Sequence, residues 1–405
     1  MRVLVCAIVG VVCVAGTPAF GQSVALTLLD ALVRAREQSP DVIVARARVD
    51  EARGRLVGAR ARFRENPSFD LFAGSRTSSS RHSADAEIGI SQLLETGGQR
   101  AARIAGAEAA VVSEEASVAN AQREALAAVA IAFLRALHAA ERGELLTAAE
   151  ATTLDIERIA SRRYQAGDIA VLDVNVARLA LSRSRSARLA GDADLTTANA
   201  DLGRLLGMVD VSVVADGSLD ADRTADFATL AAAIDHRADL KGLDAAALEA
   251  EADVTLGNAL RKPDVTAGVS AKREGMDTVL LGGLTITFPT FNSGQELRAT
   301  GRARAIRLRQ QRELARASAL ERVRGLDAAY AIRRAAATVF ESAALPSAIE
   351  NEQLSQRSFE EGEIRLTDLI VVRRELIDTR LEHLDRLLEA AETAVVRDAE
   401  AGVLR

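Results

Sequence analysis

The sequence predicts a mainly α-helical protein with a small β part, built as a tandem duplication of one helix, two strands and a long helical hairpin. The 405-residue chain contains abundant alanine and arginine and no tryptophan, which favours long helices packed through small side chains. ISQLLETGGQ (90–99) and ITFPTFNSGQ (286–295) each end a strand-like run in Gly-Gln and then enter a long helical pattern. A chain that makes the same transition twice indicates two equivalent units.

Three pairs of segments recur in the same order at nearly the same offset. They are Pro67 with Pro263 and Gly98 with Gly294, each 196 residues apart, and RYQAGDIAVLDV (163–174) with SFEEGEIRLTDL (358–369), 195 apart. Unrelated sequence is not expected to keep both order and spacing. We therefore expect two repeats, over residues 22–220 and 221–405.

Residues 1–21 have the pattern of a secretory signal peptide. A basic residue precedes an apolar run over 3–16, and residues 19–21 fit a small-x-small cleavage site whose exact position stays open. That run would reach only about 21 Å as a helix, short of the roughly 30 Å hydrocarbon core, which disfavours an uncleaved anchor. Because Cys6 and Cys13 both lie in this segment, the exported chain should have no disulfide and no thiolate metal site.

Each repeat should begin with one helix, over residues 26 to about 64 and about 226 to 260. Asn66-Pro67 and Lys262-Pro263 should end these helices, because the residue before a proline is disfavoured in the α region. Two strands should follow in each repeat, because apolar and polar residues then alternate with period two. These strands are expected near residues 67–76, 84–94, 263–273 and 278–289, joined by the polar loops SRTSSSRHS and REGMD.

Proline-free helical patterns follow the strands, over residues 99–206 and 295–345. From Gln99 to Tyr164 a single helix would extend about 100 Å, far more than the helices of a compact domain. A helix of that length needs lateral partners of similar length, so coiled-coil packing is implied.

The four strands have the length of tilted transmembrane strands, but four strands cannot close a barrel. An open edge in lipid would leave backbone groups unpaired, so a membrane interpretation requires several protomers to pool their strands, and three would give twelve. The residues expected to face lipid are Ile88, Ile90, Leu284, Ile286 and Phe288. Those expected to face a wet lumen are Asp85, Glu87, Ser91, Thr285 and Thr287.

A small soluble sheet on a helical body is the alternative. The lack of tryptophan favours it, since membrane barrels usually carry interfacial aromatic residues. Four phenylalanines are nevertheless placed to supply a thin girdle: Phe69, Phe72, Phe288 and Phe291.

No catalytic constellation is present in the sequence. The four histidines, His82, His138, His236 and His383, have no partner at helical spacing, and each is expected to be a solvated surface residue. There is no phosphate-binding loop, nucleophile elbow or dinucleotide fingerprint. The net charge of −6 and the dispersed basic residues give no support for nucleic-acid binding. We expect no enzyme activity, no metal site and no cofactor.

The order of helix, two strands and long hairpin, repeated after a signal peptide, resembles the outer-membrane factor family of TolC-like efflux proteins. LLETGGQR (93–100) is similar to the strand-to-helix signature of the cation-efflux, CzcC-like branch, and the resemblance covers essentially the whole exported chain. It implies a homotrimer in the outer membrane, in which a twelve-stranded β-barrel continues into a periplasmic tube of α-helices.

The resemblance also implies roles for three groups of residues. The turns that contain Gly167, Asp168, Ile169, Gly362, Glu363 and Ile364 would be periplasmic tips that dock on an adaptor protein, with the two isoleucines exposed. The alternative is that these glycines only break the helices. The residues Gly97, Gly98 and Gly294 would mark the passage from barrel to tube, where glycine relieves the backbone.

Asp368 matches the position of an aperture-lining aspartate in the family, and Asp173 is its counterpart in the first repeat. Threefold symmetry would gather three copies of Asp368 into a cation-selective ring. A helix-capping role is the alternative. The family's second aperture aspartate is Val371 here, which puts a double acidic ring in doubt.

The function implied by the resemblance is that of a passive exit duct of a tripartite efflux pump, working with a periplasmic adaptor and an inner-membrane transporter of RND type. A type I secretion duct, a periplasmic adaptor and a structural coiled-coil protein of the envelope are the alternatives. The LLETGGQR likeness points towards metal cations, but the sequence specifies neither the cargo, nor the pump partner, nor the resting state of the aperture.

Overall fold

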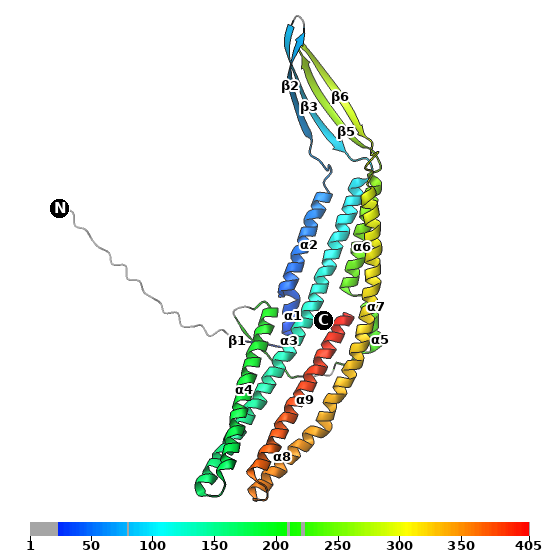
Figure 1. The fold of residues 1–405 in the computed structure, drawn as a ribbon. Coiled ribbons are helices and arrows are strands. Elements are labelled where there is room, and N and C mark those ends of the chain that lie inside the picture. Colours follow the sequence, from blue (N-terminus) through cyan, green and yellow to red (C-terminus); the bar gives the residue numbers. More distant parts are fainter. Residues whose placement is uncertain (1–22, 79–80, 209–210, 220–222, 405) are drawn as a thin grey trace, which may run out of the picture.

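The computed structural model describes residues 23–78, 81–208, 211–219 and 223–404, so the expected signal peptide lies outside the described residues. The molecule is long and narrow (Figure 1). A β-sheet forms one end, two helical hairpin tips form the other, and the short elements β1 (Ser23–Leu26), α1 (Leu28–Gln38) and α5 (Phe227–Ile234) lie between them.

The first repeat begins with two helices, α1 (Leu28–Gln38) and α2 (Pro40–Ala59), instead of the single helix expected over 26–64. The expectation was wrong because Ser39 precedes a proline and adopts an extended conformation, with φ −58° and ψ 136°. Thr27 caps α1 in a capping box with Asp30, which fixes where that helix starts.

The second repeat is interrupted at the equivalent place, between α5 (Phe227–Ile234) and α6 (Ala238–Ala259), so the helix expected over 226–260 is also wrong. No proline stands there. Arg237 is 8% exposed and has the same extended backbone, with φ −58° and ψ 141°. Its guanidinium pairs with Asp239 at 2.9 Å and with Glu400 at 3.1 Å, so buried ion pairs hold this break.

Two short strands were not expected from the sequence. β1 (Ser23–Leu26) and β4 (Ser212–Ala215) pair in parallel and form a separate two-stranded sheet. The Asp216 N–H donates to the Leu26 carbonyl at 2.9 Å, and Val213 is buried. This sheet ties the start of the first repeat to its end.

The main sheet is antiparallel with the order β2-β3-β5-β6. Its strands lie within three residues of the ranges expected from the sequence: β2 (Ser68–Ser78), β3 (Arg81–Leu94), β5 (Asp264–Glu274) and β6 (Asp277–Thr287). Facing residues in the register share one side of the sheet, as in the row Phe69, Ile90 and Val269. One side therefore carries apolar residues, and in the described chain no other element covers it.

The long helices extend away from this sheet. In the first repeat, α3 (Gln99–Ala166) is one helix of 68 residues and is followed by α4 (Val171–Leu205). In the second repeat, α7 (Gln295–Val339) passes through a π-helical turn at Phe340–Ala344 into α8 (Leu345–Glu360), and α9 (Leu366–Ala401) returns. Pro346 lies in the first turn of α8, and the wider π turn before it accommodates the missing N–H.

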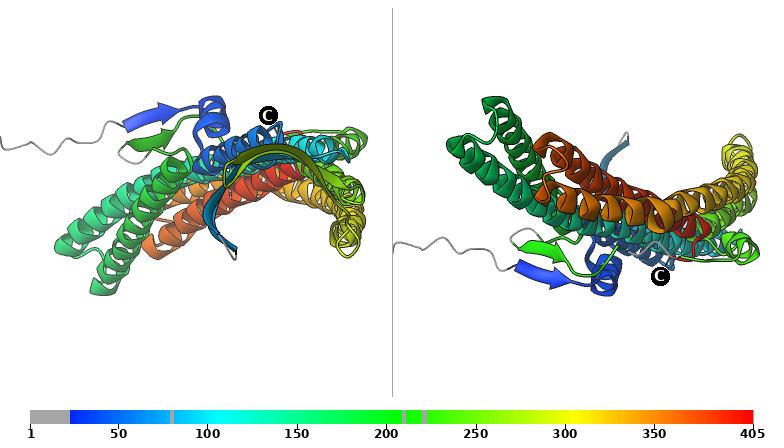
Figure 2. Two further views of the ribbon diagram at one scale, coloured as in Figure 1. Left: turned by 90° about the horizontal axis from the view of Figure 1, so that it is seen from above. Right: turned by 90° about the horizontal axis from the view of Figure 1, so that it is seen from below.

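The helices and the main sheet form one curved wall (Figure 2). The small sheet and α1 lie on its convex side. Within the described residues, none of the helices combines the length and the apolar character required to span a bilayer.

The main core lies where α3 and α9 meet α1 and α4. Phe133 is 1% exposed and is the largest apolar side chain of this core. Arg397 of α9 is also 1% exposed, so a cation is buried in the helical wall. Its guanidinium reaches Asp327 at 3.0 Å, Asp398 at 3.0 Å and the Arg223 carbonyl at 2.8 Å. The guanidinium thus joins α7, α9 and the linker between the repeats.

We predict that Arg397→Met lowers the free energy of unfolding by about 3 kcal/mol or more, because it removes the buried cation that Asp327 and Asp398 share and leaves Asp398 with Arg223, 3.8 Å away. Arg374→Met is the matched control, since Arg374 is 72% exposed in its pair with Asp378 and should change stability by less than about 1 kcal/mol. Urea unfolding followed by helical circular dichroism measures both. Equal losses in the two variants would contradict the proposed role of Arg397.

Candidate functional site

The two passages from strand to helix share one local structure. Gly98 and Gly294 are left-handed, with φ 89° and 76°, and each stands at the N-cap of a long helix. The next residue is a glutamine whose Oε1 accepts a backbone N–H from two residues earlier, at 2.8 Å from Gly97 and at 2.8 Å from Ser293. The side-chain oxygen thus accepts a backbone N–H at the helix start that would otherwise have no partner. Both residues of the repeated Gly-Gln pair therefore have a structural reason.

The glycines differ in what surrounds them. A Cβ at Gly98 would meet nothing within 4 Å, so only the backbone conformation requires glycine there. A Cβ at Gly97 would lie 2.4 Å from the Ala259 carbonyl, and one at Gly294 would lie 2.5 Å from the Gly257 carbonyl. Both passages therefore pack closely on the end of α6.

The two hairpin tips also share one local structure. Gly167 and Gly362 are left-handed, with φ 84° and 79°. The N–H groups of Gly167 and Asp168 donate to carbonyls at 3.0 and 2.9 Å, and those of Gly362 and Glu363 do so at 3.2 and 2.8 Å. This is a Schellman arrangement, in which a left-handed glycine terminates the helix. The capping geometry accounts for the glycines, and their part in docking stays a prediction.

The expected exposure of Ile169 and Ile364 was wrong. Both side chains are half-buried. They pack on a cluster between the hairpin helices, made of Ile156, Ala160, Val174, Ala177, Phe359, Leu366 and Leu369. The exposed aliphatic residues of the first tip are Val171 and Leu172, at 55% and 67%. They occupy the first turn of α4, which sequence periodicity alone does not orient.

Asp368 and Asp173 both lie in the first turn of a helix that leaves a tip. The Asp368 carboxylate accepts the Arg365 N–H at 3.1 Å, so a capping interaction is present. The Asp368 side chain is exposed, whereas Asp173 is half-buried. The aperture role of the two aspartates stays a prediction, and Asp368 is the better placed to contact an ion.

Two histidines are not the solvated residues expected from the sequence. His138 is 14% exposed and its Nε2 lies 2.7 Å from Asp385 across the contact between α3 and α9. His383 is 18% exposed, stacks on Phe340 and lies 3.5 Å from Glu341. Packing of the long helices encloses both rings. Across the part of the chain that the structure describes, no three His, Cys, Asp or Glu residues are grouped to hold a metal ion.

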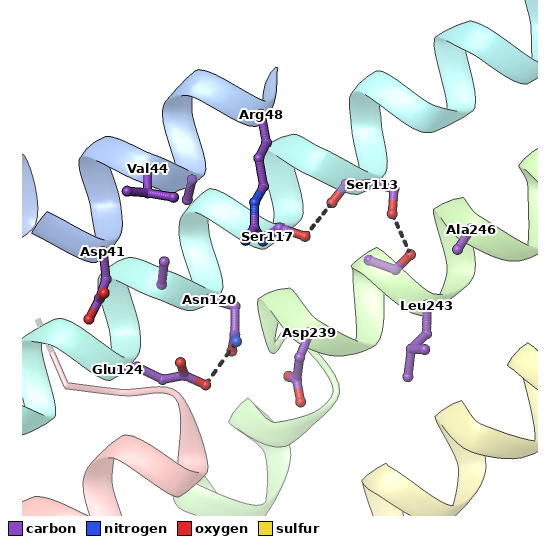
Figure 3. A pocket seen from close by; sticks show the side chains of 13 residues that line it. Asp41, Val44, Arg48, Ser113, Ser117, Asn120, Glu124, Asp239, Leu243 and Ala246 are labelled. Atoms are coloured by element: carbon purple, nitrogen blue, oxygen red, sulfur yellow. Dashed lines mark hydrogen bonds between the residues drawn. The ribbon is translucent and has the colours of Figure 1, made fainter. Parts of the chain in front are cut away.

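A polar depression of about 620 Å³ lies between α2, α3 and α6, where the two repeats meet (Figure 3). Its side chains bond to neighbouring groups: the Ser113 hydroxyl donates to the Gly242 carbonyl, and the Asn120 amide donates to Glu124. Burial pushes the pKa of Asp239 upward, but hydrogen bonds from Arg237 and its charge outweigh burial and leave that pKa below its ordinary value. We therefore interpret the depression as a packing feature of the helical wall and not as a binding site.

Comparison with known sequences gives a family match and a curated relative. Residues 31–208 match the family described as outer membrane efflux protein. The chain is 26% identical over 381 residues to the cobalt-zinc-cadmium resistance protein CzcC of Cupriavidus metallidurans, covering 93% of this chain and 90% of that protein.

Solved structures show the same fold at low identity. A membrane protein from Pseudomonas aeruginosa is similar with a TM-score of 0.77 and 16% identity, over 92% of this chain and 90% of that one. CusC, whose crystal structures concern the conformational changes that accompany folding and transmembrane channel formation, is similar with a TM-score of 0.75 and 17% identity. The match covers 92% of this chain and 91% of that one.

We predict that Gly294→Ala destabilises the protein more than Gly98→Ala does. Both variants force alanine into the left-handed region, at a cost of about 1–2 kcal/mol. Only the Gly294 variant also places a Cβ against the Gly257 carbonyl. Urea unfolding of the two purified variants measures the difference, and equal stabilities would show that the close approach to α6 is unimportant.

Proposed function

The chain belongs to the outer membrane efflux protein family, and we propose that it is the outer-membrane exit duct of a tripartite efflux pump. It acts as a channel and not as an enzyme. Cargo enters from a periplasmic adaptor and an inner-membrane transporter of RND type, and passes through the helical tube and the barrel to the exterior. The observation that carries the proposal is a sheet with one uncovered apolar side that continues directly into a long helical wall.

The uncovered side of the sheet suits lipid. Ile88, Ile90 and Leu284 are 47%, 55% and 72% exposed, and they share that side with further aliphatic residues of all four strands. A patch of this kind is unfavourable in water and favourable against acyl chains. The other side carries charged residues such as Asp85 and Glu87, which suit a water-filled lumen.

Equivalent residues of the two repeats support assembly of several copies. Phe359, Leu366 and Leu384 of the second repeat are 7%, 6% and 4% exposed. Their first-repeat counterparts, in the same order, are 48%, 55% and 54% exposed: Tyr164, Val171 and Leu189. Leu366 and Leu384 lie on α9, which packs between α3 and the α7–α8 helix. Their counterparts lie on α4, which packs mainly on α3. The uncovered surface of α4 would pack on α7 and α8 of a second copy. Three copies joined in this way close the wall as a homotrimer.

The hairpin tips lie at the end opposite the sheet and are the proposed docking site for the adaptor (Figure 1). The turn residues Gly167, Asp168, Gly362 and Glu363 form the tips. Apolar contact there comes from Leu172, because Ile169 and Ile364 are half-buried against the cluster between the hairpin helices and Val171 faces a second copy.

We infer that the cargo includes divalent metal cations. The support is the relative named as a cobalt-zinc-cadmium resistance protein, together with the exposed Asp368, of which the trimer would gather three. A duct of this kind conducts ions without binding them tightly, so the proposal needs no chelating site.

The test of cargo is deletion of the gene in its own host. We expect growth to become more sensitive to cobalt, zinc or cadmium, and the wild-type gene on a plasmid should restore resistance. A deletion strain with unchanged metal tolerance and raised drug sensitivity would contradict the metal assignment while leaving the duct in place.

We predict that Asp368→Asn raises the single-channel conductance of the purified trimer in planar bilayers and weakens its block by multivalent cations. Asparagine keeps the shape of the side chain and removes its charge, so capping is little disturbed. Asp378→Asn is the control, since Asp378 lies on the same helix and is 57% exposed. Unchanged conductance in the Asp368 variant would mean that this residue is only a cap.

A further inference from the structure

Phe72 lies on the charged side of the main sheet and not on the apolar side. In the register it faces Glu87, which in turn faces Lys272. Facing residues share one side of a sheet, so Phe72 lies on the side that suits a water-filled lumen. Phe69, three positions earlier, faces Ile90 on the apolar side. The placement of Phe72 in a lipid-facing girdle was therefore wrong, because an odd spacing along a strand reverses the side.

Little surrounds the Phe72 ring. Phe72 is 63% exposed, and two of its neighbours on the same side of the sheet are glycines, Gly74 and Gly89. A Cβ at Gly74 would meet nothing within 4 Å. Among the described residues of the four strands, Phe72 is the only aromatic side chain on this side. Since an apolar ring gains nothing from contact with water, its face remains available to a ligand.

Two carboxylates flank the ring. Asp70 precedes Phe72 by two residues on β2 and lies on the same side, about 7 Å away along the strand. Glu87 stands directly opposite Phe72 on β3, at a Cβ–Cβ distance of about 5 Å. Both carboxylates are therefore within reach of a ligand that stacks on the ring.

The cations on this side of the sheet are engaged elsewhere. The Lys272 ammonium lies 2.5 Å from Glu274. The Arg76 guanidinium lies 2.9 Å from Asp85 and 3.4 Å from Glu274. Within the part of the chain that the structure describes, neither of the carboxylates that flank Phe72 forms an ion pair. An exposed aromatic ring thus stands between two negative charges that no cation compensates directly.

We propose that Asp70, Phe72 and Glu87 form a binding site for organic cations on the wall of the barrel lumen, so that the trimer carries three such sites. An aromatic face attracts a cation, and the carboxylates add to that attraction. A strongly hydrated metal ion gains little from the ring, whereas a pyridinium or quaternary ammonium group brings apolar surface to it. The inference rests on the proposed function, since it requires the charged side of the sheet to face a water-filled lumen.

The chain has no tryptophan, so Phe72→Trp places the only indole of the protein at the site and keeps an aromatic face there. Its trimer is reconstituted in phosphatidylcholine vesicles. Its fluorescence is quenched with acrylamide, caesium and N-methylpyridinium, each measured relative to free N-acetyltryptophanamide. We expect the pyridinium to quench at least about threefold better than acrylamide on this relative scale, and caesium to gain less. Adding Glu87→Gln should lower the pyridinium advantage, because one charge is removed.

Phe69→Trp is the matched control, because it lies on the apolar side of the same strand. In vesicles with brominated acyl chains, we expect quenching of Phe69→Trp and none of Phe72→Trp. Quenching of Phe72→Trp by brominated lipid would overturn the site, because the ring would then face the bilayer.

Equal gains for caesium and pyridinium would also overturn the site, because charge alone would explain them. So would a pyridinium advantage that Glu87→Gln leaves unchanged. In each case, quenching of Phe69→Trp by brominated lipid would leave the membrane duct intact, whereas its absence would overturn the duct together with the site. If Phe72→Trp does not assemble, saturation-transfer NMR of N-methylpyridinium compares the wild type with Phe72→Leu, and equal signals would overturn the site.

Discussion

The backbone groups on the outer edges of β2 and β6 have no partner strand in the described chain, and a lipid environment offers none. Much of the proposed architecture depends on that constraint. If β2 of one copy pairs with β6 of the next, three copies satisfy every edge and close a ring of strands. The curvature shared by the sheet and the helices then continues around the same axis, so that barrel and tube become one conduit.

The helical wall has an equivalent requirement. Within one chain, α9 is enclosed by α3 on one side and by α7 and α8 on the other, and its apolar residues Leu366, Leu376 and Leu384 are buried. The same surface of α4 is left half covered, because the neighbour that the duplication calls for belongs to another copy. The proposed duplication accounts for this arrangement: two units of one fold would supply both the covered and the uncovered version of one contact.

Differences between the repeats are as informative as their likeness. Both passages from strand to helix use a left-handed glycine and a glutamine cap, but one carries a buried Glu95–Arg103 pair and the other an exposed Phe291. Equivalent backbone positions therefore meet different surroundings. In a duct, such differences can separate residues that face lipid from residues that face protein or water.

Much of this protein could be read from its sequence, because the determining interactions are local. The period of the apolar pattern located the four strands and the 68-residue α3, and the repeated Gly-Gln and Gly turns identified the two passages and the two tips.

The tertiary structure alone decided which side chains are covered. Ile169, Ile364, His138 and His383 were expected at the surface, yet packing between helices far apart in the sequence encloses them. It also decided the break at Arg237, which depends on a carboxylate 163 residues away, and the pairing of β1 with β4. Burial is a property of neighbours, and no local pattern specifies neighbours that the chain brings together only on folding.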